Sequence, residues 1–189
     1  MAEDFTEQAL GRLTTAGLLE AFTGMDAPAV QEMDGEYAAR LLAQPNAFAV
    51  LTGHGCVSNP LMRWACKGFR PVDGDSGRGY NAFSGLGRLR GRYPMRTLVA
   101  PSRYDGRPAY TLIYRAFHSA CGTLHMVDEV RRAAPGVYLG MGTWGFTDRQ
   151  RRVPRPFLLT GPTAPYRQDV GRPRAGFVPG LRELPRHHA

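Results

Sequence analysis

The sequence has almost no lysine. Lys67 is the only lysine among 24 basic side chains, and all of the others are arginines. A general preference for arginine, in a chain that is also rich in alanine, glycine and proline, is typical of genomic base composition. The segment LMRWACKGFR (61–70) departs from this preference. Lys67 is therefore a candidate for a role that arginine does not fill.

Cysteine and long apolar runs are scarce too. The chain has three cysteines (Cys56, Cys66 and Cys121), an odd number without a C-x-x-C pair, which argues against a disulfide framework and favours reduced thiols. The first 30 residues lack a basic start followed by an apolar core, and no apolar run approaches the roughly 18 residues of a membrane span. We therefore expect a soluble, cytoplasmic protein without a membrane span.

Acidic residues are scarce in the second half of the chain. The net charge is +8, and nine arginines follow from residue 149 onward. Arginine binds phosphate through paired donors, so one hypothesis is an arginine-rich interaction module that binds nucleic acid or an acidic protein. Solvated arginines in an arginine-preferring chain explain the same charge, so nucleic acid is not an expected partner.

A chain of 189 residues with 43% hydrophobic residues is typical of one globular domain. Residues 4–22 carry apolar side chains at spacings of three and four, which predicts a helix. The segment GEYAARLL (35–42) is either a short helix or an opening strand. We divide the chain into an N-terminal helical segment (1–44), a β domain (45–161) and a tail rich in proline, glycine and arginine (162–189), draped over the domain or partly disordered.

After residue 45, glycine, proline and aromatic residues recur between short apolar runs. This spacing is typical of antiparallel sheets and barrels. The predicted strands are 47–51, 62–70, 77–84, 88–102, 108–117, 122–133, 136–146 and 154–161. Asp105-Gly106 predicts a tight hairpin turn. The predicted fold is mainly β: an antiparallel β-barrel of about 7–8 strands behind a helical segment.

Several of these strands share motifs with a known group of proteins. The motifs are RWACKGF (63–69), LIYRAF (112–117), HMVDEVRR (125–132), GVYLGMG (136–142) and RPFLL (155–159). Over about residues 33–160 the chain resembles uncharacterised bacterial proteins in which a G-x-W-x-G element precedes a second domain of unknown function. The name-giving element corresponds to GEYAA (35–39), with tyrosine in place of tryptophan. The resemblance implies a lipocalin-like (calycin-like) β-barrel and implies no activity.

Lys67 is expected on a strand. Alternation puts Trp64, Cys66 and Gly68 on one face, and Lys67 and Phe69 on the other. Inside a barrel mouth, Lys67 could neutralise a ligand carboxylate, or act as a base or Schiff-base nucleophile once desolvation lowers its pKa. The alternative is a surface lysine, or one that packs its aliphatic stem across the strand.

The segment MVDEVRR (126–132) places two acids beside two arginines. Alternation puts Glu129 and Arg131 on one face and Asp128 on the other. An inward acid held by an inward arginine could orient a polar head group or act as a general acid or base, so Asp128 and Glu129 join Lys67 as catalytic candidates. The alternative is an ordinary cross-strand ion pair.

Two further patterns indicate no site. The segments HGC and HSAC contain four possible zinc ligands: His54, Cys56, His118 and Cys121. Neither spacing is that of a zinc finger. VDGDSGRGYNAF (72–83) is rich in glycine but does not lead into a helix, so a surface hairpin is expected instead of a phosphate site. We expect no metal and no cofactor.

These patterns favour a barrel that binds a small hydrophobic or amphipathic molecule with a polar or anionic head. The alternatives are a cyclase or isomerase of a secondary metabolite on the same barrel, and the interaction module above. The candidate ligand-binding residues are Trp64, Lys67, Phe69, Tyr80, Tyr114, Glu129, Arg131 and Trp144.

Overall fold

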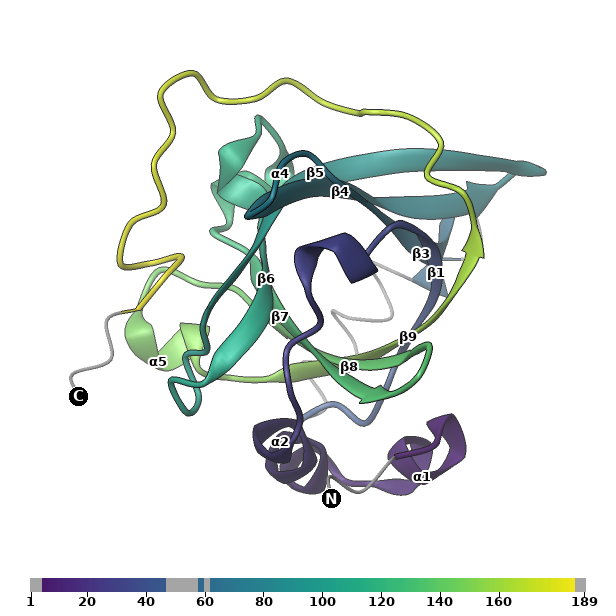
Figure 1. Ribbon diagram of the computed structural model, residues 1–189, viewed down its shortest axis with the longest axis vertical. Coiled ribbons are helices and arrows are strands. Elements are labelled where there is room, and N and C mark those ends of the chain that lie inside the picture. Colours follow the sequence, from purple (N-terminus) through teal and green to yellow (C-terminus); the bar gives the residue numbers. More distant parts are fainter. Residues whose placement is uncertain (1–4, 47–57, 60–61, 186–189) are drawn as a thin grey trace.

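Eight antiparallel strands close into a barrel. The computed structural model describes residues 5–46, 58–59 and 62–185. The strand order is β1-β9-β8-β7-β6-β5-β4-β3, and β1 also pairs with β3, which closes the ring seen in Figure 1. The strands are β1 (Gly35–Leu41), β3 (Met62–Pro71), β4 (Ser76–Gly85), β5 (Arg88–Pro101), β6 (Pro108–Ile113), β7 (Val127–Ala134), β8 (Val137–Thr143) and β9 (Arg155–Ala164), while β2 (Ser58–Asn59) pairs with β3 alone. The predicted antiparallel barrel behind a helical segment is confirmed.

The N-terminal helix predicted over 4–22 is two helices, α1 (Glu7–Arg12) and α2 (Thr15–Gly24). The chain turns extended at Leu13, and the Thr14 side chain accepts a hydrogen bond from the Gly17 amide. A threonine at a helix start satisfies an otherwise unpaired backbone amide, so Thr14 favours the start of a new helix here. The spacing of the apolar residues continues across this break and does not reveal it.

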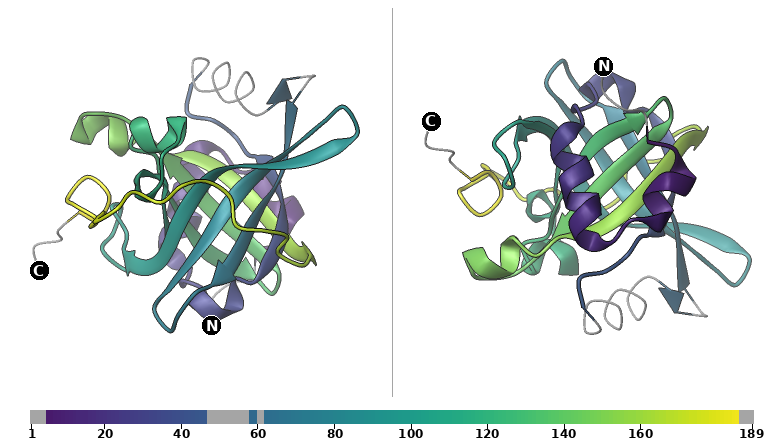
Figure 2. Two further views of the ribbon diagram at one scale, coloured as in Figure 1. Left: turned by 90° about the horizontal axis from the view of Figure 1, so that it is seen from above. Right: turned by 90° about the horizontal axis from the view of Figure 1, so that it is seen from below.

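The two helices cover one outer side of the barrel. Leu10 of α1 and Leu18 and Phe22 of α2 are fully buried, and they pack with Leu139 and Leu158 of β8 and β9. Figure 2 shows both helices lying across these strands. The side chains of β8 and β9 that meet the helices are therefore apolar, whereas Tyr138, Phe157 and Leu159 face the interior.

Aromatic rings fill the barrel interior. Tyr37 lies 5.5 Å from Tyr138 and 5.7 Å from Phe69, and Phe69 lies 5.6 Å from Tyr110, measured between ring centroids. The short helix η1 (Val30–Glu32) lies over one end of the barrel, at the centre of the ring in Figure 1. Its Glu32 accepts hydrogen bonds from the hydroxyls of Tyr37 and Tyr138. The end that η1 covers is therefore closed.

Several predicted element boundaries are corrected. GEYAARLL contains the strand β1, which lies inside the predicted helical segment 1–44. The predicted strand 108–117 ends at Ile113, where η2 (Tyr114–Ala116) begins. The predicted strand 122–133 starts at Val127 because α4 (Ala120–Thr123) comes first, capped by Ser119. Another short helix, α5 (Asp148–Arg151), precedes β9. The predicted strand 47–51 lies outside the described residues.

The C-terminal segment crosses the outer face of β3 and β4. We call residues 165–185 the strap; Figure 2 shows it in yellow over these strands. Asp169 of the strap lies 2.7 Å from Arg70 and 3.0 Å from Arg78. Tyr166 and Val170 pack against a small outer cluster around Cys66. Residues 165–185 therefore lie against the outside of the barrel, and residues 162–164 of the predicted tail belong to β9.

Candidate functional site

A β-bulge sets the direction of Trp64. Pairing between β3 and β4 shifts register between Trp64 and Cys66, so one extra residue lies on β3 there. Such a residue exchanges the faces of the side chains on one side of the bulge. Trp64 therefore joins Phe69 in the interior cluster, and Cys66 faces outward. The prediction that Trp64 and Cys66 share a face is wrong, because strict alternation does not include the bulge.

Lys67 lies inside the barrel and is 2% exposed. Its ammonium group donates three hydrogen bonds: to Asn81 Oδ1 at 2.9 Å, to the Tyr114 hydroxyl at 2.6 Å and to Asp128 Oδ2 at 2.8 Å. An ammonium group has three protons, so these contacts use its full donor capacity. The surface alternative for Lys67 is excluded by this burial.

The partners of Lys67 also bind one another. The Tyr114 hydroxyl donates to Asp128 Oδ2 at 2.8 Å and accepts from Asn81 Nδ2 at 3.0 Å. Trp64 Nε1 donates to Asn81 Oδ1 at 3.1 Å. We call these five residues the polar cluster: Trp64, Lys67, Asn81, Tyr114 and Asp128. They come from β3, β4, η2 and β7, so the closed barrel brings them together.

The polar cluster lies in aromatic surroundings. The Lys67 ammonium is 5.1 Å from the ring centroid of Phe157 and 5.3 Å from that of Trp64, at cation–π distances. Burial and the neighbouring Asp128 carboxylate raise the pKa of Tyr114 well above its ordinary value, so this hydroxyl keeps its proton. The Lys67–Asp128 ion pair cancels formally, and the cluster is electrically neutral with many oriented donors and acceptors.

Asn81 was missed by the sequence analysis. It lies in the segment GRGYNAFS of β4, within a run of small and aromatic residues. Asparagine is depleted in strands, so its presence within a predicted strand was the signal available. The side chain is buried and bonds three of the other cluster residues. It acts as the connector of the cluster.

Glu129 lies on the outer face of the barrel, not inside it. Its carboxylate accepts from the Ser102 hydroxyl at 2.5 Å and from Arg103 Nε at 2.9 Å. Arg103 also donates to the backbone carbonyl groups of Arg151 and Glu183, so this pair joins the β5–β6 loop to α5 and the strap. The interior role expected for Glu129 is corrected, because the inward face of β7 carries Asp128 and Val130.

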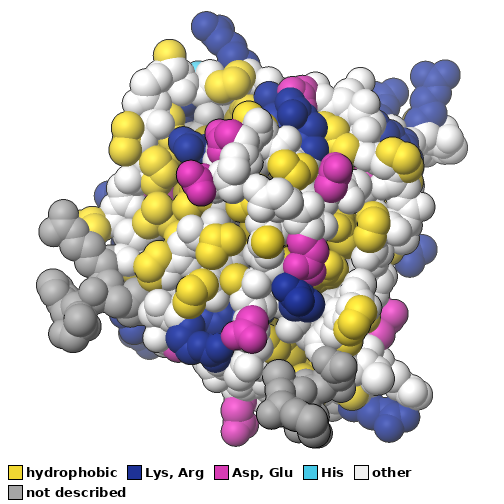
Figure 3. All heavy atoms as spheres, viewed as in Figure 1, with side chains coloured by type: hydrophobic (Ala, Val, Ile, Leu, Met, Phe, Trp, Pro, Cys, Tyr) yellow, Lys and Arg dark blue, Asp and Glu magenta, His cyan; other side chains and the backbone are white. Residues whose placement is uncertain are grey.

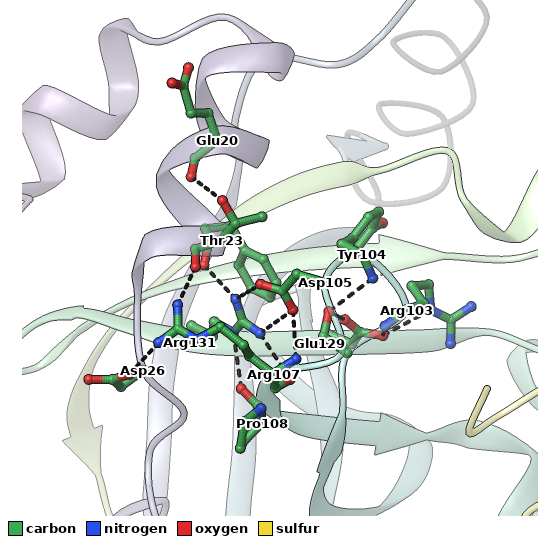
Figure 4. A network of polar contacts seen from close by, with 12 residues as sticks. Glu20, Thr23, Asp26, Arg103, Tyr104, Asp105, Arg107, Pro108, Glu129 and Arg131 are labelled. Atoms are coloured by element: carbon green, nitrogen blue, oxygen red, sulfur yellow. Dashed lines mark hydrogen bonds and ion pairs between the residues drawn. The ribbon is translucent and has the colours of Figure 1, made fainter. Parts of the chain in front are cut away.

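Arg131 is likewise on the outer face, fully buried beneath α2. It donates to Asp105 through both terminal nitrogens, each at 2.7 Å, and to the carbonyls of Phe22 and Pro108. Figure 4 shows Arg131 among these groups, with Arg107 beside it reaching Thr23 and Asp26. Arg131 therefore attaches the helix and the β5–β6 loop to the barrel, and its expected ligand contact is corrected too.

The remaining candidates divide between the two faces. Phe69 lies inside as expected, but Tyr80 lies outside, where its hydroxyl donates to Glu36 at 2.5 Å. Trp144 follows β8 and is half-buried, with the Arg155 guanidinium 5.1 Å from its ring centroid. Of the eight residues expected to contact a ligand, the barrel interior therefore holds Trp64, Lys67, Phe69 and Tyr114.

A hollow of about 380 Å³ lies where β1 and β3 separate. The two strands pair from Gly35 to Ala38 of β1, and the rest of β1 pairs with β9 alone. The hollow is lined by Glu7, Ala38, Ala39, Arg40, Arg63, Trp64, Ala65, Ser84, Leu158 and Thr160. Trp64 thus lines the hollow and also belongs to the polar cluster.

Other features of the described residues are less informative. No group of three or more potential metal ligands occurs within 5–46, 58–59 and 62–185. His54 and Cys56 of the weighed zinc set lie outside these ranges, and His118 is exposed. The segment 72–75 forms the β3–β4 turn, as expected, with Asp73 accepting from the amides of Asp75 and Ser76. None of the helices in the described part of the chain is long and apolar enough to cross a membrane.

Fold and site together define a class: a closed antiparallel barrel with one polar cluster in an aromatic interior. No family model matches the sequence, and a search of curated proteins gives no match. Among solved structures, the chain is similar to a crystal structure of a protein from Thermomonospora curvata, at 20% identity and a TM-score of 0.49. The alignment covers 78% of this chain and 87% of that one.

Proposed function

We propose that the protein binds a small hydrophobic or amphipathic molecule whose polar head reaches the polar cluster. The observation that carries this proposal is the convergence of five polar groups in an interior lined mainly by aromatic and aliphatic side chains. A buried ion pair is often no more stabilising than apolar residues of the same volume, so stability alone is a weak reason for it. Binding sites for small molecules typically combine apolar walls with a few oriented polar groups.

The charge of the polar cluster indicates which kind of ligand head it would accept. Lys67 is already neutralised by Asp128 at 2.8 Å, so an anionic head gains little there. A hydroxyl or carbonyl head can exchange hydrogen bonds with Tyr114 and Asn81 without adding charge to a low-dielectric interior. We therefore favour a neutral polar head over the anionic one at this depth.

Trp64 is the proposed gate. The end of the barrel beneath η1 is closed, while Trp64 lies between the hollow and Asn81. The interior rings are closely packed, so a ligand can enter only if a side chain moves. Among the residues that line the hollow, Trp64 is also bonded to the polar cluster. Rotation of its indole breaks one hydrogen bond to Asn81, which the ligand head replaces.

The test uses tryptophan fluorescence. The chain has two tryptophans, so Trp144→Phe leaves Trp64 as the reporter. The probes are a bromine-labelled long-chain alcohol and the fatty acid of the same length, because bromine quenches tryptophan at contact. We expect quenching that saturates, with tighter binding of the alcohol. Native mass spectrometry of gently purified protein, followed by denaturing extraction, checks for a retained natural ligand.

A matched pair of variants locates the binding. Tyr114→Phe and Tyr80→Phe each remove one hydroxyl from a buried tyrosine, the first inside the barrel and the second outside it. Loss of a ligand hydrogen bond lowers affinity by roughly tenfold, so we expect that loss for Tyr114→Phe and unchanged affinity for Tyr80→Phe. Equal effects of the two variants, or no saturable quenching by either probe together with a clean mass, would refute the proposal.

A catalytic role on the same barrel is the second candidate. Tyr114 and Asp128 share a proton donor and acceptor at 2.8 Å beside an ammonium group, which is the arrangement that an acid or base in an isomerisation requires. Turnover of a bound ligand that stops in Asp128→Asn while binding persists would distinguish the enzyme from a carrier.

A further inference from the structure

The hairpin between β4 and β5 projects beyond the barrel, as the long teal strands in Figure 1 show. Its projecting part, residues 84–92 with the sequence SGLGRLRGR, contains no acidic residue. Arg88, Arg90 and Arg92 are all exposed, and no contact within the described residues pairs any of the three with an acid. Figure 3 shows basic side chains standing out over this corner of the molecule.

These three arginines point to one face. Arg92 pairs with Asn81 and Arg90 pairs with Phe83 across the ladder, and directly paired residues share a face. Asn81 and Phe83 face the barrel interior. Near the polar cluster this face of the hairpin lines the barrel interior. Beyond the barrel the same face is an exposed basic surface that ends at Arg88.

The tip of the hairpin carries an apolar side chain in an unfavourable setting. Leu86 is 94% exposed, and its backbone φ is +50° in the turn formed with Gly87, whose φ is +71°. Two-residue turns of this kind favour asparagine, aspartate or glycine, because a side chain such as leucine is strained at positive φ. Leu86 therefore has two local costs, in backbone strain and in exposed apolar surface, and neither is offset within the described chain.

From these observations we propose that the β4–β5 hairpin docks onto an anionic lipid bilayer. Leu86 inserts at the level of the head groups, while Arg88, Arg90 and Arg92 contact lipid phosphates. An apolar tip above a row of basic side chains fits a surface that is charged outside and apolar beneath. A nucleic acid offers the same phosphates but no apolar layer for the leucine, so the membrane accounts for both features.

Docking in this way would bring the bilayer close to Trp64, the proposed gate. Arg90 pairs with Phe83, which in turn pairs with Trp64, so the basic face is continuous with the proposed gate. An amphipathic ligand could then move between the bilayer and the barrel without crossing water. The docking itself does not depend on a ligand.

The experiment measures binding of the full chain to vesicles, in phosphatidylcholine alone and in phosphatidylcholine mixed with phosphatidylserine. We expect binding only with phosphatidylserine, and weaker binding at high salt. Each arginine near an anionic surface contributes roughly a fivefold gain in partitioning. The variant Arg88→Gln/Arg90→Gln/Arg92→Gln should therefore lose roughly a hundredfold.

Two further variants make the result specific. Arg149→Gln/Arg152→Gln/Arg172→Gln removes the same charge from exposed arginines elsewhere and should bind as the natural sequence does. Leu86→Asn keeps the charge and suits the positive φ, so it should unfold at an unchanged or higher temperature and yet lose roughly tenfold in binding.

Three outcomes would overturn the proposal: no binding to phosphatidylserine vesicles at low salt, equal losses in the two triple variants, or binding of duplex DNA that matches vesicle binding and is insensitive to Leu86→Asn. The vesicles contain no brominated probe. Failure of docking therefore leaves the ligand proposal standing, and failure of probe binding leaves docking standing.

Discussion

Three acceptors surround the ammonium group of Lys67 in directions that a lysine can satisfy. Asn81, Tyr114 and Asp128 lie at 2.6 to 2.9 Å from one nitrogen atom. Arginine spreads five donors over a flat, wider group and suits acceptors that lie in its plane. This geometry explains why a chain that otherwise uses arginine has lysine at this position.

Substitutions at Lys67 should therefore be costly even when they conserve charge. We expect Lys67→Arg to lower the free energy of unfolding by about 1–3 kcal/mol through overpacking. Lys67→Met should cost about 3–5 kcal/mol, because it leaves the buried Asp128 carboxylate without its cationic partner. Urea unfolding measures both. The double variant Lys67→Met/Asp128→Asn should recover part of the loss, and wild-type stability of Lys67→Arg would contradict this account.

At the scale of elements, Arg131 and Asp105 join α2 to the β5–β6 loop. Burial favours a raised pKa for Asp105, but the hydrogen bonds and the positive charge of Arg131, together with those of Arg107, outweigh it and hold that pKa below the ordinary 3.8. A carboxylate whose pKa is depressed by folding stabilises the fold above its unfolded pKa, and that stabilisation disappears as the pH falls through the folded value.

Asp105→Asn should accordingly show a pH-dependent deficit. At neutral pH we expect it to be less stable than the natural sequence by about 2–3 kcal/mol, because Arg131 loses a charged partner and keeps its carbonyl acceptors. The difference should shrink as the pH drops below about 4, where the natural carboxyl also gains a proton. Chemical unfolding at a series of pH values tests this, and a deficit that is constant down to pH values near 2 would show that Asp105 is not the titrating group.

A glycine that leaves room for an aromatic ring on the neighbouring strand is a second feature of the packing. Gly140 of β8 pairs with Phe157 of β9, and a side chain at Gly140 would overlap the Phe157 ring. Gly140→Ala should cost about 1–3 kcal/mol, and Gly140→Ala/Phe157→Leu should recover part of it by making room. Thermal unfolding of the two variants provides the comparison, with Gly24→Ala as a control, because nothing lies near that position. An equally large loss in the control would remove the packing explanation.

The strands also show what could be predicted from the sequence. Alternation along β6 puts Tyr110 and Leu112 on one face, and both do lie in the interior, because β6 is regular. It failed at Trp64 because a bulge leaves no mark on apolar periodicity. For β7 it correctly separated Asp128 from Glu129, but periodicity alone does not say which face is inward. That choice depends on α2 and the strap, which cover the outer face from distant parts of the chain.

For the whole molecule, the strap determines which outward residues meet water. Cys66 faces out of the barrel and is still buried, because Tyr166 and Val170 cover it. Burial, with a smaller contribution from the nearby Glu36 carboxylate, raises the pKa of the Cys66 thiol from 9.0 to about 12. Stability from the protonated thiol is complete below pH 9.0 and declines as the pH rises toward about 12.

The buried thiol gives a readout for the strap. Alkylation requires the thiolate form. A pKa of about 12 instead of 9.0 lowers the thiolate fraction of Cys66 roughly a thousandfold near pH 8. We expect Cys66 to react with iodoacetamide at least that much more slowly in the folded chain than in urea, as followed by peptide mass spectrometry. Tyr166→Ala/Val170→Ala should speed the reaction while the circular dichroism of the barrel is unchanged, because the β1–β3 and β1–β9 ladders close it without the strap. Equal rates in the folded and unfolded chain would mean that the strap does not cover Cys66 in solution. A variant that reacts faster only as it unfolds would show that the strap holds the barrel together, and then the molecule is one cooperative unit from η1 to its C-terminal segment.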